Sequence, residues 1–425
     1  MLYFNSTNGY KLEKQYMNTT WRQCTIGDVC DTISNTYNSN AQQVVLINTS
    51  DVLEGKVLNH IYIPNENLKG QFKKTFEEGD ILYSEIRPQN KRYAYIDFAP
   101  INYIASTKLM VIRNKNIVKS KYLYYFLQSD KIISELQMLA ETRSGTFPQI
   151  TFNELSKLSI KIPPLPEQDR IISILDSICK KIDINQQIND NLEEQAKALF
   201  KSWFVDFEPF KGGKFVDSKL GPIPEGWSIG KVNDVVQILS GFAFKSETFV
   251  QSGPYRLITI KGVQDGYLDI SGASYISKVP LKMPAYCNLE IGDILLSLTG
   301  NVGRVCIVDR PNLLLNQRVA KLQPRRDKQD LLFVYILFRQ DTFKNHLLQI
   351  ARGTAQLNLS PVETREISII LPPANVLLEF SKIGQYLFDK IALSNQETLR
   401  LSALRDTLLP KLMSGELSVE EVSFD

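Results

Sequence analysis

Residues 165–204 carry their apolar side chains along one narrow helical stripe. Prolines stand at 163, 164 and 166, and neither Pro nor Gly follows until Pro209, so one uninterrupted helix is predicted. The stripe advances by alternating steps of three and four residues: Leu175, Ile178, Ile182, Asn185, Asn189, Leu192, Ala196, Leu199 and Trp203. This pattern is typical of a coiled-coil face. Over residues 167–203 such a helix would be about 55 Å long, at 1.5 Å per residue, and would require a partner of similar length.

Residues 374–414 provide that partner within the same chain. Their seam also has a polar centre and comprises Phe380, Leu387, Ile391, Ser394, Thr398, Leu401 and Leu408. The asparagines of the first seam, with Ser394 and Thr398 of the second, predict a polar layer in the middle of the helix pair. Each long helix follows an apolar strand ending in two prolines, and Pro163 and Pro372 lie 209 residues apart. The chain is therefore predicted to be a tandem repeat.

The segments before the long helices repeat with nearly the same period. A short strand and a helical turn follow Trp21 and again Trp227, and later a Gly-Asp turn leads into a buried strand in each copy. One helix rich in Tyr, Phe and Leu is expected over 121–139 and its counterpart over 331–351. We therefore expect two α+β domains of the same fold, each followed by a long helix.

The expected boundaries cover the whole chain. They are a leader at 1–20, a first domain at 21–164, a long helix at 165–204, a linker at 205–226, a second domain at 227–373, a second long helix at 374–414 and a tail at 415–425.

Composition narrows the classes of protein. The longest apolar run, residues 331–338, is far shorter than a bilayer of about 30 Å requires, so we expect a soluble, cytoplasmic protein with no membrane partner. Five scattered cysteines without a CxxC pair favour reduced thiols. Only two histidines are present, which argues against a His-based metal centre or catalytic triad.

The distribution of charge favours the two domains, and not the first helix, as binders of a polyanion. Lys and Arg outnumber Asp and Glu by 17 to 14 over 21–163 and by 17 to 12 over 227–373, whereas the helix over 167–203 has 5 against 7. Motifs for DNA chemistry are missing: the sequence has no Asn/Asp-Pro-Pro-aromatic tetrad, no GxxxxGK[ST] loop and no carboxylate–lysine cluster of a nuclease. The Gly-rich stretch 300–304 lacks the Lys-Ser/Thr ending and is interpreted as a turn between strands.

Four extended motifs connect the chain to a known family. They are PPLPEQDRI at 163–171, LFKSWFVDFEPF at 199–210, GPIPEGW at 221–227 and LRDTLLPKLMSGEL at 404–417. In this order, the chain resembles the specificity subunit of Type I DNA restriction-modification systems from Trp21 to Leu417. One departure is that the second proline motif reads PPANVLLEF at 372–380, so its equivalence to the first rests on position.

The resemblance implies a fold and a set of partners. It implies two repeated target recognition domains with pseudo-twofold symmetry, separated by two long antiparallel coiled-coil helices, with each domain reading half of a bipartite target in double-stranded DNA. It implies no active site and no cofactor bound by this chain. The implied partners are two methyltransferase subunits, which use S-adenosylmethionine to methylate adenine at N6, and two restriction motor-nuclease subunits, which use ATP and magnesium.

Candidate DNA contacts lie in loops rich in cations and amides. Arg can contact guanine O6 and N7, and Asn or Gln can contact adenine N6 and N7. In the first domain the candidates are Arg87, Gln89, Asn90, Lys91, Arg92, Arg143, Ser144, Gly145 and Thr146. In the second domain they are Ser240, Gly241, Phe242, Lys245, Lys261, Asn301, Arg304, Gln317, Arg318, Arg352, Gly353 and Thr354.

Structural alternatives exist for these loops. A Gly-Thr loop occupies the same place in both halves, where glycine permits a close approach to a phosphate but also suits a helix C-cap. The loop over 87–92 is equally compatible with a hairpin whose charges confer solubility. Two other functions stay open: a self-contained DNA-modifying enzyme, and a coiled-coil scaffold with no DNA role.

Overall fold

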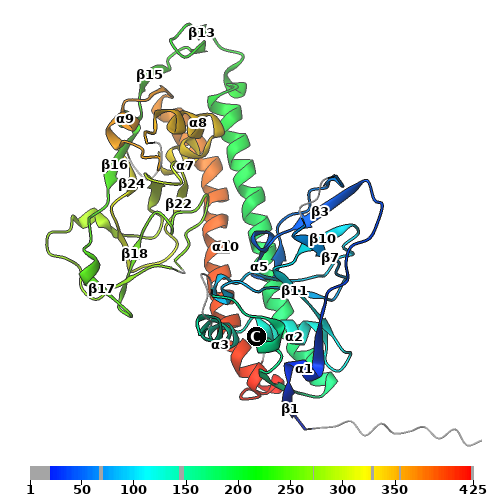
Figure 1. Ribbon diagram of the computed structural model, residues 1–425. Helices are drawn as coiled ribbons and strands as arrows, with labels where there is room; N and C mark the ends of the chain where they lie inside the picture. Colours follow the sequence, from blue (N-terminus) through cyan, green and yellow to red (C-terminus); the bar gives the residue numbers. More distant parts are fainter. Residues whose placement is uncertain are drawn as a thin grey trace, which may run out of the picture. The chain divides into compact units, whose positions relative to one another are not determined.

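The computed structural model describes residues 20–66, 70–142, 148–270, 272–326, 330–353 and 356–422 (Figure 1). The chain divides into two compact units, Met1–Lys181 with Leu401–Asp425, and Ile182–Arg400. Helices α5 (Leu165–Phe204) and α10 (Ala374–Ser414) each contribute residues to both units. The two predicted long helices are thereby confirmed.

The first unit contains two four-stranded sheets. One is antiparallel throughout, in the order β2 (Cys30–Ile33), β11 (Leu109–Asn114), β8 (Ile81–Ser84) and β9 (Tyr93–Tyr95). The other has the order β6 (Ile63–Pro64), β3 (Gln43–Ile47), β10 (Tyr103–Ser106) and β7 (Phe72–Lys74), with β3 and β10 parallel. Outside these sheets, β1 (Arg22–Thr25) pairs with β12 (Ser159–Ile162), and β4 (Val52–Leu53) pairs with β5 (Lys56–Val57).

The second unit repeats this arrangement. Its antiparallel sheet has the order β16 (Val236–Ser240), β24 (Val319–Pro324), β21 (Ile294–Ser297) and β22 (Val305–Ile307). Its other sheet has the order β17 (Phe249–Val250), β19 (Tyr275–Ile276), β18 (Tyr255–Ile258), β23 (Leu313–Leu315) and β20 (Asn288–Leu289), with β18 and β23 parallel. Here β15 (Ser228–Lys231) pairs with β25 (Ser368–Leu371). The predicted α+β repeat is confirmed.

The Gly-Asp turns before β8 and β21 are built in the same way. Asp80 accepts a hydrogen bond from the amide of Glu77 at 2.7 Å, and Asp293 accepts one from Glu290 at 2.9 Å. Each aspartate also has a cation on the neighbouring strand, Arg113 at 2.7 Å and Lys321 at 2.8 Å. The glycines before them have φ of 89° and 96°, a left-handed conformation that favours Gly.

The helix expected in each half after the sheets is in fact two helices. The first unit has α2 (Ser120–Leu127) and α3 (Asp130–Glu141), and the second has α7 (Leu331–Arg339) and α8 (Asp341–Ile350). The single helices predicted over 121–139 and 331–351 were therefore wrong. Ser129 and Gln340 are extended, with ψ of 138° and 134°, and an aspartate starts the next helix, where the macrodipole favours a negative charge.

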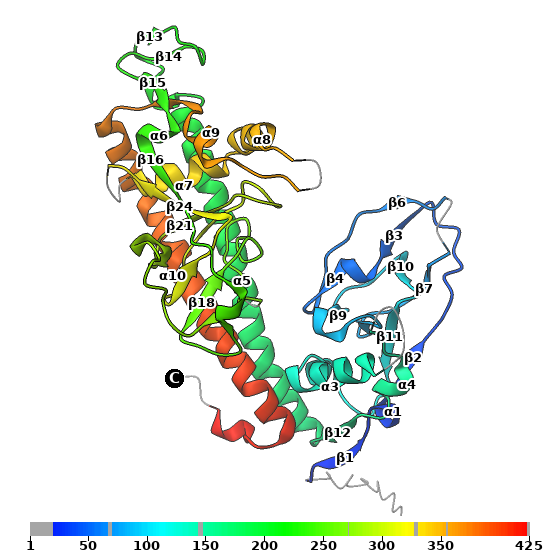
Figure 2. The same cartoon turned by 60° about the vertical axis from the view of Figure 1, so that its left-hand side comes forward.

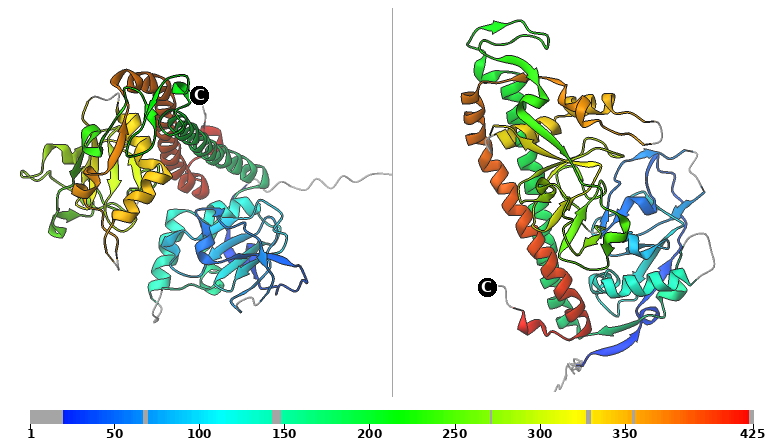
Figure 3. Two further views of the ribbon diagram at one scale, coloured as in Figure 1. Left: turned by 90° about the horizontal axis from the view of Figure 1, so that it is seen from above. Right: turned by 90° about the vertical axis from the view of Figure 1, so that its left-hand side faces the viewer.

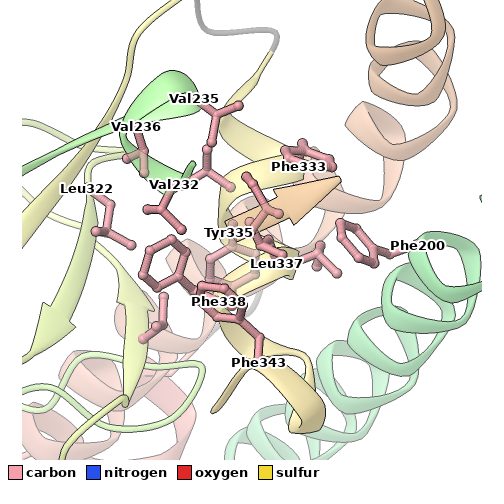
Figure 4. Close-up of a cluster of buried hydrophobic side chains, with 14 of the residues drawn as sticks. Phe200, Val232, Val235, Val236, Leu322, Phe333, Tyr335, Leu337, Phe338 and Phe343 are labelled. Atoms are coloured by element: carbon pink, nitrogen blue, oxygen red, sulfur yellow. The ribbon is translucent and has the colours of Figure 1, made fainter. Parts of the chain in front are cut away.

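Helix α7 lies within a large hydrophobic core of the second unit. Residues 332–339 are all buried, because one side packs on the sheet and the other on the long helices. Figure 4 shows Phe333, Tyr335 and Phe338 between α6 (Val232–Val235) and Phe200 of α5. The ring of Phe333 lies 5.4 Å from that of Phe200. In the first unit, α2 packs on β11, whereas α3 packs on α2 and on the helical turn η2 (Pro88–Asn90) (Figure 3).

The predicted polar layer is present where α5 and α10 pair within the second unit. Asn185 donates to the Glu397 carboxylate at 2.8 Å, and Asn189 donates to the Asn395 side chain at 2.7 Å. Ser394 donates to the carbonyl of Asn185 at 3.3 Å. Ser394 is a predicted member of this layer. The residues that accept hydrogen bonds from the two asparagines, Glu397 and Asn395, lie beside the predicted seam rather than on it.

The segment predicted as a linker has its own structure. It contains a short helical turn, η3 (Glu208–Phe210), and an antiparallel pair, β13 (Phe215–Val216) and β14 (Ile223–Pro224), which Figure 2 shows beyond β15. The rings of Phe207 and Phe210 lie 5.4 Å and 5.1 Å from Trp227. Burial of these aromatic side chains holds the segment against the second unit, so it is more ordered than a tether.

Candidate nucleic-acid interface

Four loops meet at one end of the antiparallel sheet in the second unit. Strands β16 and β21 end there, and β24 and β22 begin there, because neighbouring strands run in opposite directions. The amide of Leu298 donates to Arg318 at 2.9 Å, and that of Leu359 donates to Leu298 at 2.7 Å, so the loops form one continuous backbone surface. We call this surface the second edge; it comprises residues 240–242, 297–304, 316–319, 352–353 and 356–359.

The first unit has the same end, built from equivalent backbone bonds. The amide of Glu85 donates to Lys108 at 3.0 Å, as that of Leu298 does to Arg318. The amide of Arg87 donates to Pro148 at 3.1 Å, as Gly300 does to Leu357 at 2.9 Å. We call this surface the first edge; it comprises residues 84–92, 106–109 and 148–150.

Several cations on these edges have a left-handed backbone. Arg87, Lys91 and Arg318 have φ of 46°, 52° and 69°, and they are the only Lys or Arg with positive φ in the part of the chain that the structure describes. Gly300, the equivalent of Arg87, has φ of 73°. Such a conformation costs a non-glycine residue about 1–3 kcal/mol and is concentrated at functional sites.

The predicted first-domain residues of the loop 87–92 all lie on the first edge, between β8 and β9. Arg87, Gln89 and Asn90 are exposed. Lys91 pairs with Asp130 at 3.1 Å. Arg92 points back into the domain, because its guanidinium donates to the carbonyls of residues 50 and 52 at 3.0 Å and 3.4 Å. Arg92 is therefore placed to support the loop. The candidates Arg143, Ser144, Gly145 and Thr146 lie outside the described residues.

The structure brings most second-domain candidates together on the second edge. These are Ser240, Gly241, Phe242, Asn301, Arg304, Gln317, Arg318, Arg352 and Gly353. Two of them are glycines for steric reasons. A Cβ on Gly241 would lie 2.1 Å from the carbonyl oxygen of Asn316, and one on Gly353 would lie 2.3 Å from that of Gln356. Close packing between two loops thus accounts for Gly241, and close packing within its own loop, together with a φ of 120°, accounts for Gly353.

Other candidates are attached to the edge or lie beyond it. The Arg304 guanidinium donates to Gln264, and Gln264 donates to the carbonyl of Lys261 at 2.7 Å, which ties Lys261 to the edge. Lys245 is not brought to the edge. It starts a helical turn, η4 (Ser246–Thr248), that leads into the other sheet, and it lies 3.6 Å from Glu247. Thr354 lies outside the described residues.

The remaining cations differ in how far they are neutralised. The exposed Arg352 forms an ion pair with Glu363 of α9 (Pro361–Arg365). The exposed Arg318 has no ion-pair partner within the described ranges, so its five donors face solvent.

The structure adds Lys108 and Gln149 to the first edge and connects Lys74 to its backbone; none of the three is a sequence candidate. Lys108 is equivalent to Arg318, and its ammonium lies 3.2 Å from Gln149 Oε1. Lys74 donates to the carbonyls of residues 107 and 109 at 3.0 Å and 2.8 Å, and burial lowers its pKa. The sequence repeat could have identified Lys108. Residues 106–113 correspond to residues 316–323, so Lys108 corresponds to the candidate Arg318.

Within the described residues, no three or more His, Cys, Asp and Glu side chains are grouped so that they could hold a metal ion. None of the helices there is both long enough and apolar enough to cross a membrane.

Comparison with known proteins gives the family. Residues 18–194 and 224–402 match the model of the Type I restriction modification DNA specificity domain. The chain belongs to this family. Its two copies of the domain contain the two edges, and membership makes the chain a DNA sequence-recognition subunit. Specificity subunits of this family are in general non-catalytic.

Individual relatives agree with the family model. The specificity subunit of the Type I restriction enzyme HindI from Haemophilus influenzae is 34% identical, over 93% of this chain and 99% of that protein. The MjaIX specificity subunit from Methanocaldococcus jannaschii is 31% identical, over 76% of this chain and 77% of that protein. Among solved structures, the S subunit of the Type I system from M. genitalium aligns over 94% of this chain and 98% of that one, with 18% identity and a TM-score of 0.47.

Proposed function

We propose that this chain reads a bipartite sequence in double-stranded DNA, with one half-site contacted by each edge. The observation that supports this most strongly is the presence of two edges with the same backbone hydrogen bonds, one in each copy of the specificity domain. Two equivalent surfaces with different side chains are what two different half-sites require. The predicted contact residues remain predictions until binding is measured.

We infer that the chain acts as one subunit of a larger enzyme. Its proposed partners are two methyltransferase subunits and two motor-nuclease subunits, in line with the family to which it belongs. S-adenosylmethionine, ATP and magnesium are proposed to bind those partners and not this chain. The activities of the whole enzyme would be adenine-N6 methylation and ATP-dependent cleavage, carried out in the cytoplasm, where its DNA substrate is found.

The side chains on the edges suit readout of bases in the major groove. The exposed side chains of Arg318 and Gln317 could contact guanine and adenine edges, respectively. Cations that are already paired, such as Lys91, have weaker attraction for phosphates. We therefore expect a moderate dependence of affinity on salt, carried by the cations without carboxylate partners.

The test is to map N6-methyladenine in DNA from cells that express this chain with its methyltransferase subunit. The proposal predicts two short half-sites separated by a spacer of fixed length. One continuous motif, or no motif that depends on this chain, would overturn it. Methyl transfer by the purified chain alone would instead identify a self-contained enzyme, and a lack of salt-dependent affinity for duplex DNA would identify a scaffold.

A further inference from the structure

The two edges present different side chains on the same backbone. Matching hydrogen bonds make Glu85 equivalent to Leu298, and Lys108 equivalent to Arg318. Gln149 is likewise equivalent to Asn358, because each forms a β-bridge to the residue that follows Glu85 or Leu298. A shared scaffold with unlike side chains at the same places is the arrangement expected where two domains read different bases.

In the first edge, the side chains of Glu85 and Gln149 both contact Lys108. The Lys108 ammonium lies 3.2 Å from the Gln149 amide oxygen and 3.6 Å from the Glu85 carboxylate. The Lys108 side chain is 49% exposed and that of Glu85 is 19% exposed, so the group reaches solvent while its members limit each other's freedom. The contact with Lys108 leaves the NH₂ group of Gln149 available as a donor.

The charges in this group favour base contacts over phosphate contacts. A carboxylate beside Lys108 cancels much of its attraction for a phosphate and would itself be repelled by the DNA backbone. Together, though, the three side chains offer donors and acceptors that match base edges: Lys for guanine, Gln for adenine and Glu for the amino group of cytosine. At 3.6 Å and with Lys108 half exposed, this ion pair contributes little to folding.

We propose that Glu85, Lys108 and Gln149 determine the base specificity of the first half-site. Arg318 and Asn358 have the corresponding role in the second edge, where the Asn358 amide is held by Thr299 at 2.8 Å. This inference rests on the proposed function, since it assigns residues to a recognition event that the edges are proposed to perform.

The test replaces Lys108 by Ala and Gln149 by Ala, one at a time, in the full chain expressed with its methyltransferase subunit. Each variant should lose discrimination at one base position of the first half-site by roughly 10- to 100-fold. The second half-site and the spacer should stay unchanged. The measurement is the methylated motif, together with the salt dependence of DNA binding by the purified complex.

Lys115→Ala provides a matched control. Lys108 and Lys115 flank the same strand, β11, and Lys115 has a similar exposure and a similar carboxylate partner, Asp31 at 3.0 Å. It lies at the opposite end of the strand, away from the first edge. Lys115→Ala should therefore keep the wild-type motif, although it removes the same charge from the same domain.

The outcomes separate this inference from the proposed function. An unchanged motif in Lys108→Ala and Gln149→Ala would overturn the inference, and so would an equal loss on all sequences with a shallower salt dependence, which marks phosphate contacts. A wild-type chain without a bipartite motif would overturn the proposed function instead. If the alanine variants unfold, Lys108→Arg with Gln149→Asn installs the residues of the second edge on the same backbone. That variant should fold and change the first half-site, and an unchanged motif would again overturn the inference.

Discussion

At the scale of single residues, Arg352 combines a candidate DNA contact with a structural one. Its guanidinium pairs with Glu363, which lies in the first turn of α9. The Arg352 side chain is 82% exposed and that of Glu363 is 36% exposed, and ion pairs open to solvent typically contribute about 0–1 kcal/mol to stability. Arg352 can therefore leave the Glu363 carboxylate for an acceptor on DNA at a small cost in free energy. Until DNA binds, the ion pair keeps the Arg352 side chain in place.

Replacement of Arg352 and Thr354 by Ala should weaken binding to the half-site of the second domain. The base preferences of the first half-site should not change, because each domain has its own core. Binding should be measured with duplexes in which one half-site at a time is altered. Glu363→Gln is the control: it releases Arg352 and removes a negative charge, so affinity should hold or rise if Arg352 contacts DNA.

Three results would change the role assigned to Arg352 as a contact to the second half-site. Equal losses in Arg352→Ala and Glu363→Gln would mean that the pair only holds α9. A uniform loss on all DNA sequences would mark a phosphate contact. No loss in the double variant would reduce the Gly-Thr loop to a helix cap.

Loop composition located the candidate edges, but it did not reveal the orientation of the side chains. Arg92 is part of a cationic loop, yet it points inward because two carbonyls of a distant segment accept its hydrogen bonds. Lys108 could have been predicted from its repeat partner Arg318. Gln149 could not, since only the β-bridge to Ile86 brings it next to Lys108.

At the scale of elements, a buried ion pair joins α7 to α5 in the second unit. Arg339 donates to Glu193 at 2.6 Å, and their side chains are only 6% and 14% exposed. Tyr335 donates to the same carboxylate at 3.0 Å. Loss of Arg339 would leave the buried Glu193 without this cation, and loss of Glu193 would leave the buried Arg339 with the more distant Asp265, at 3.7 Å; either change costs far more than the pair itself contributes.

Glu193→Gln and Arg339→Met should each destabilise the second unit by about 3 kcal/mol. The double variant should be less destabilised than the sum of the two, because no buried charge is left. Amide hydrogen exchange of α7 in the full chain reports the stability of this unit separately. Additive effects would show that the two side chains act independently. Lys201→Ala, at an exposed position of α5, is the control and should have little effect.

Asp265 extends this cluster and gives it a pH dependence. Burial raises the pKa of Asp265, but the hydrogen bond from Lys344 at 2.8 Å and the charge of Arg339 outweigh burial and hold it below its ordinary value. A lowered carboxylate pKa stabilises the fold above the unfolded-state pKa of about 3.9, and this stability is lost as the pH falls through the folded-state pKa. Exchange protection of α7 should therefore fall below about pH 4 more steeply in the wild type than in Asp265→Asn. Equal slopes would exclude this carboxylate as the cause.

The long helices were predictable because their stripe stays regular over about forty residues. The break between α2 and α3 was not, since the signal for it is a single Ser-Asp pair inside a continuous apolar pattern. The partners of the asparagines were also missed in part. Glu397 reaches Asn185 from beside the seam, and the length of its side chain makes this possible.

At the scale of the whole chain, the repeat assigns one edge to each copy of the specificity domain. The segment that connects the copies includes one uninterrupted helix of 40 residues, α5, paired with α10. If these helices set the distance between the half-sites, their length should appear in the DNA spacer. The polar layer gives a place to change that length, because Asn189 pairs directly with Asn395.

Insertion of seven residues after Asn189 and of seven before Asn395 keeps both seams in register, since seven residues are one heptad. Each helix becomes about 10 Å longer at 1.5 Å per residue. DNA rises about 3.4 Å per base pair, so the spacer of the methylated motif should grow by roughly three pairs.

An insertion in α5 alone is the control: it breaks the pairing of the layer and should give an inactive or unstable protein. The half-site sequences should not change in the matched variant, because neither edge is altered. An unchanged spacer in an active variant would refute a ruler role for the helices, and altered half-sites would mean that the helices themselves contact bases.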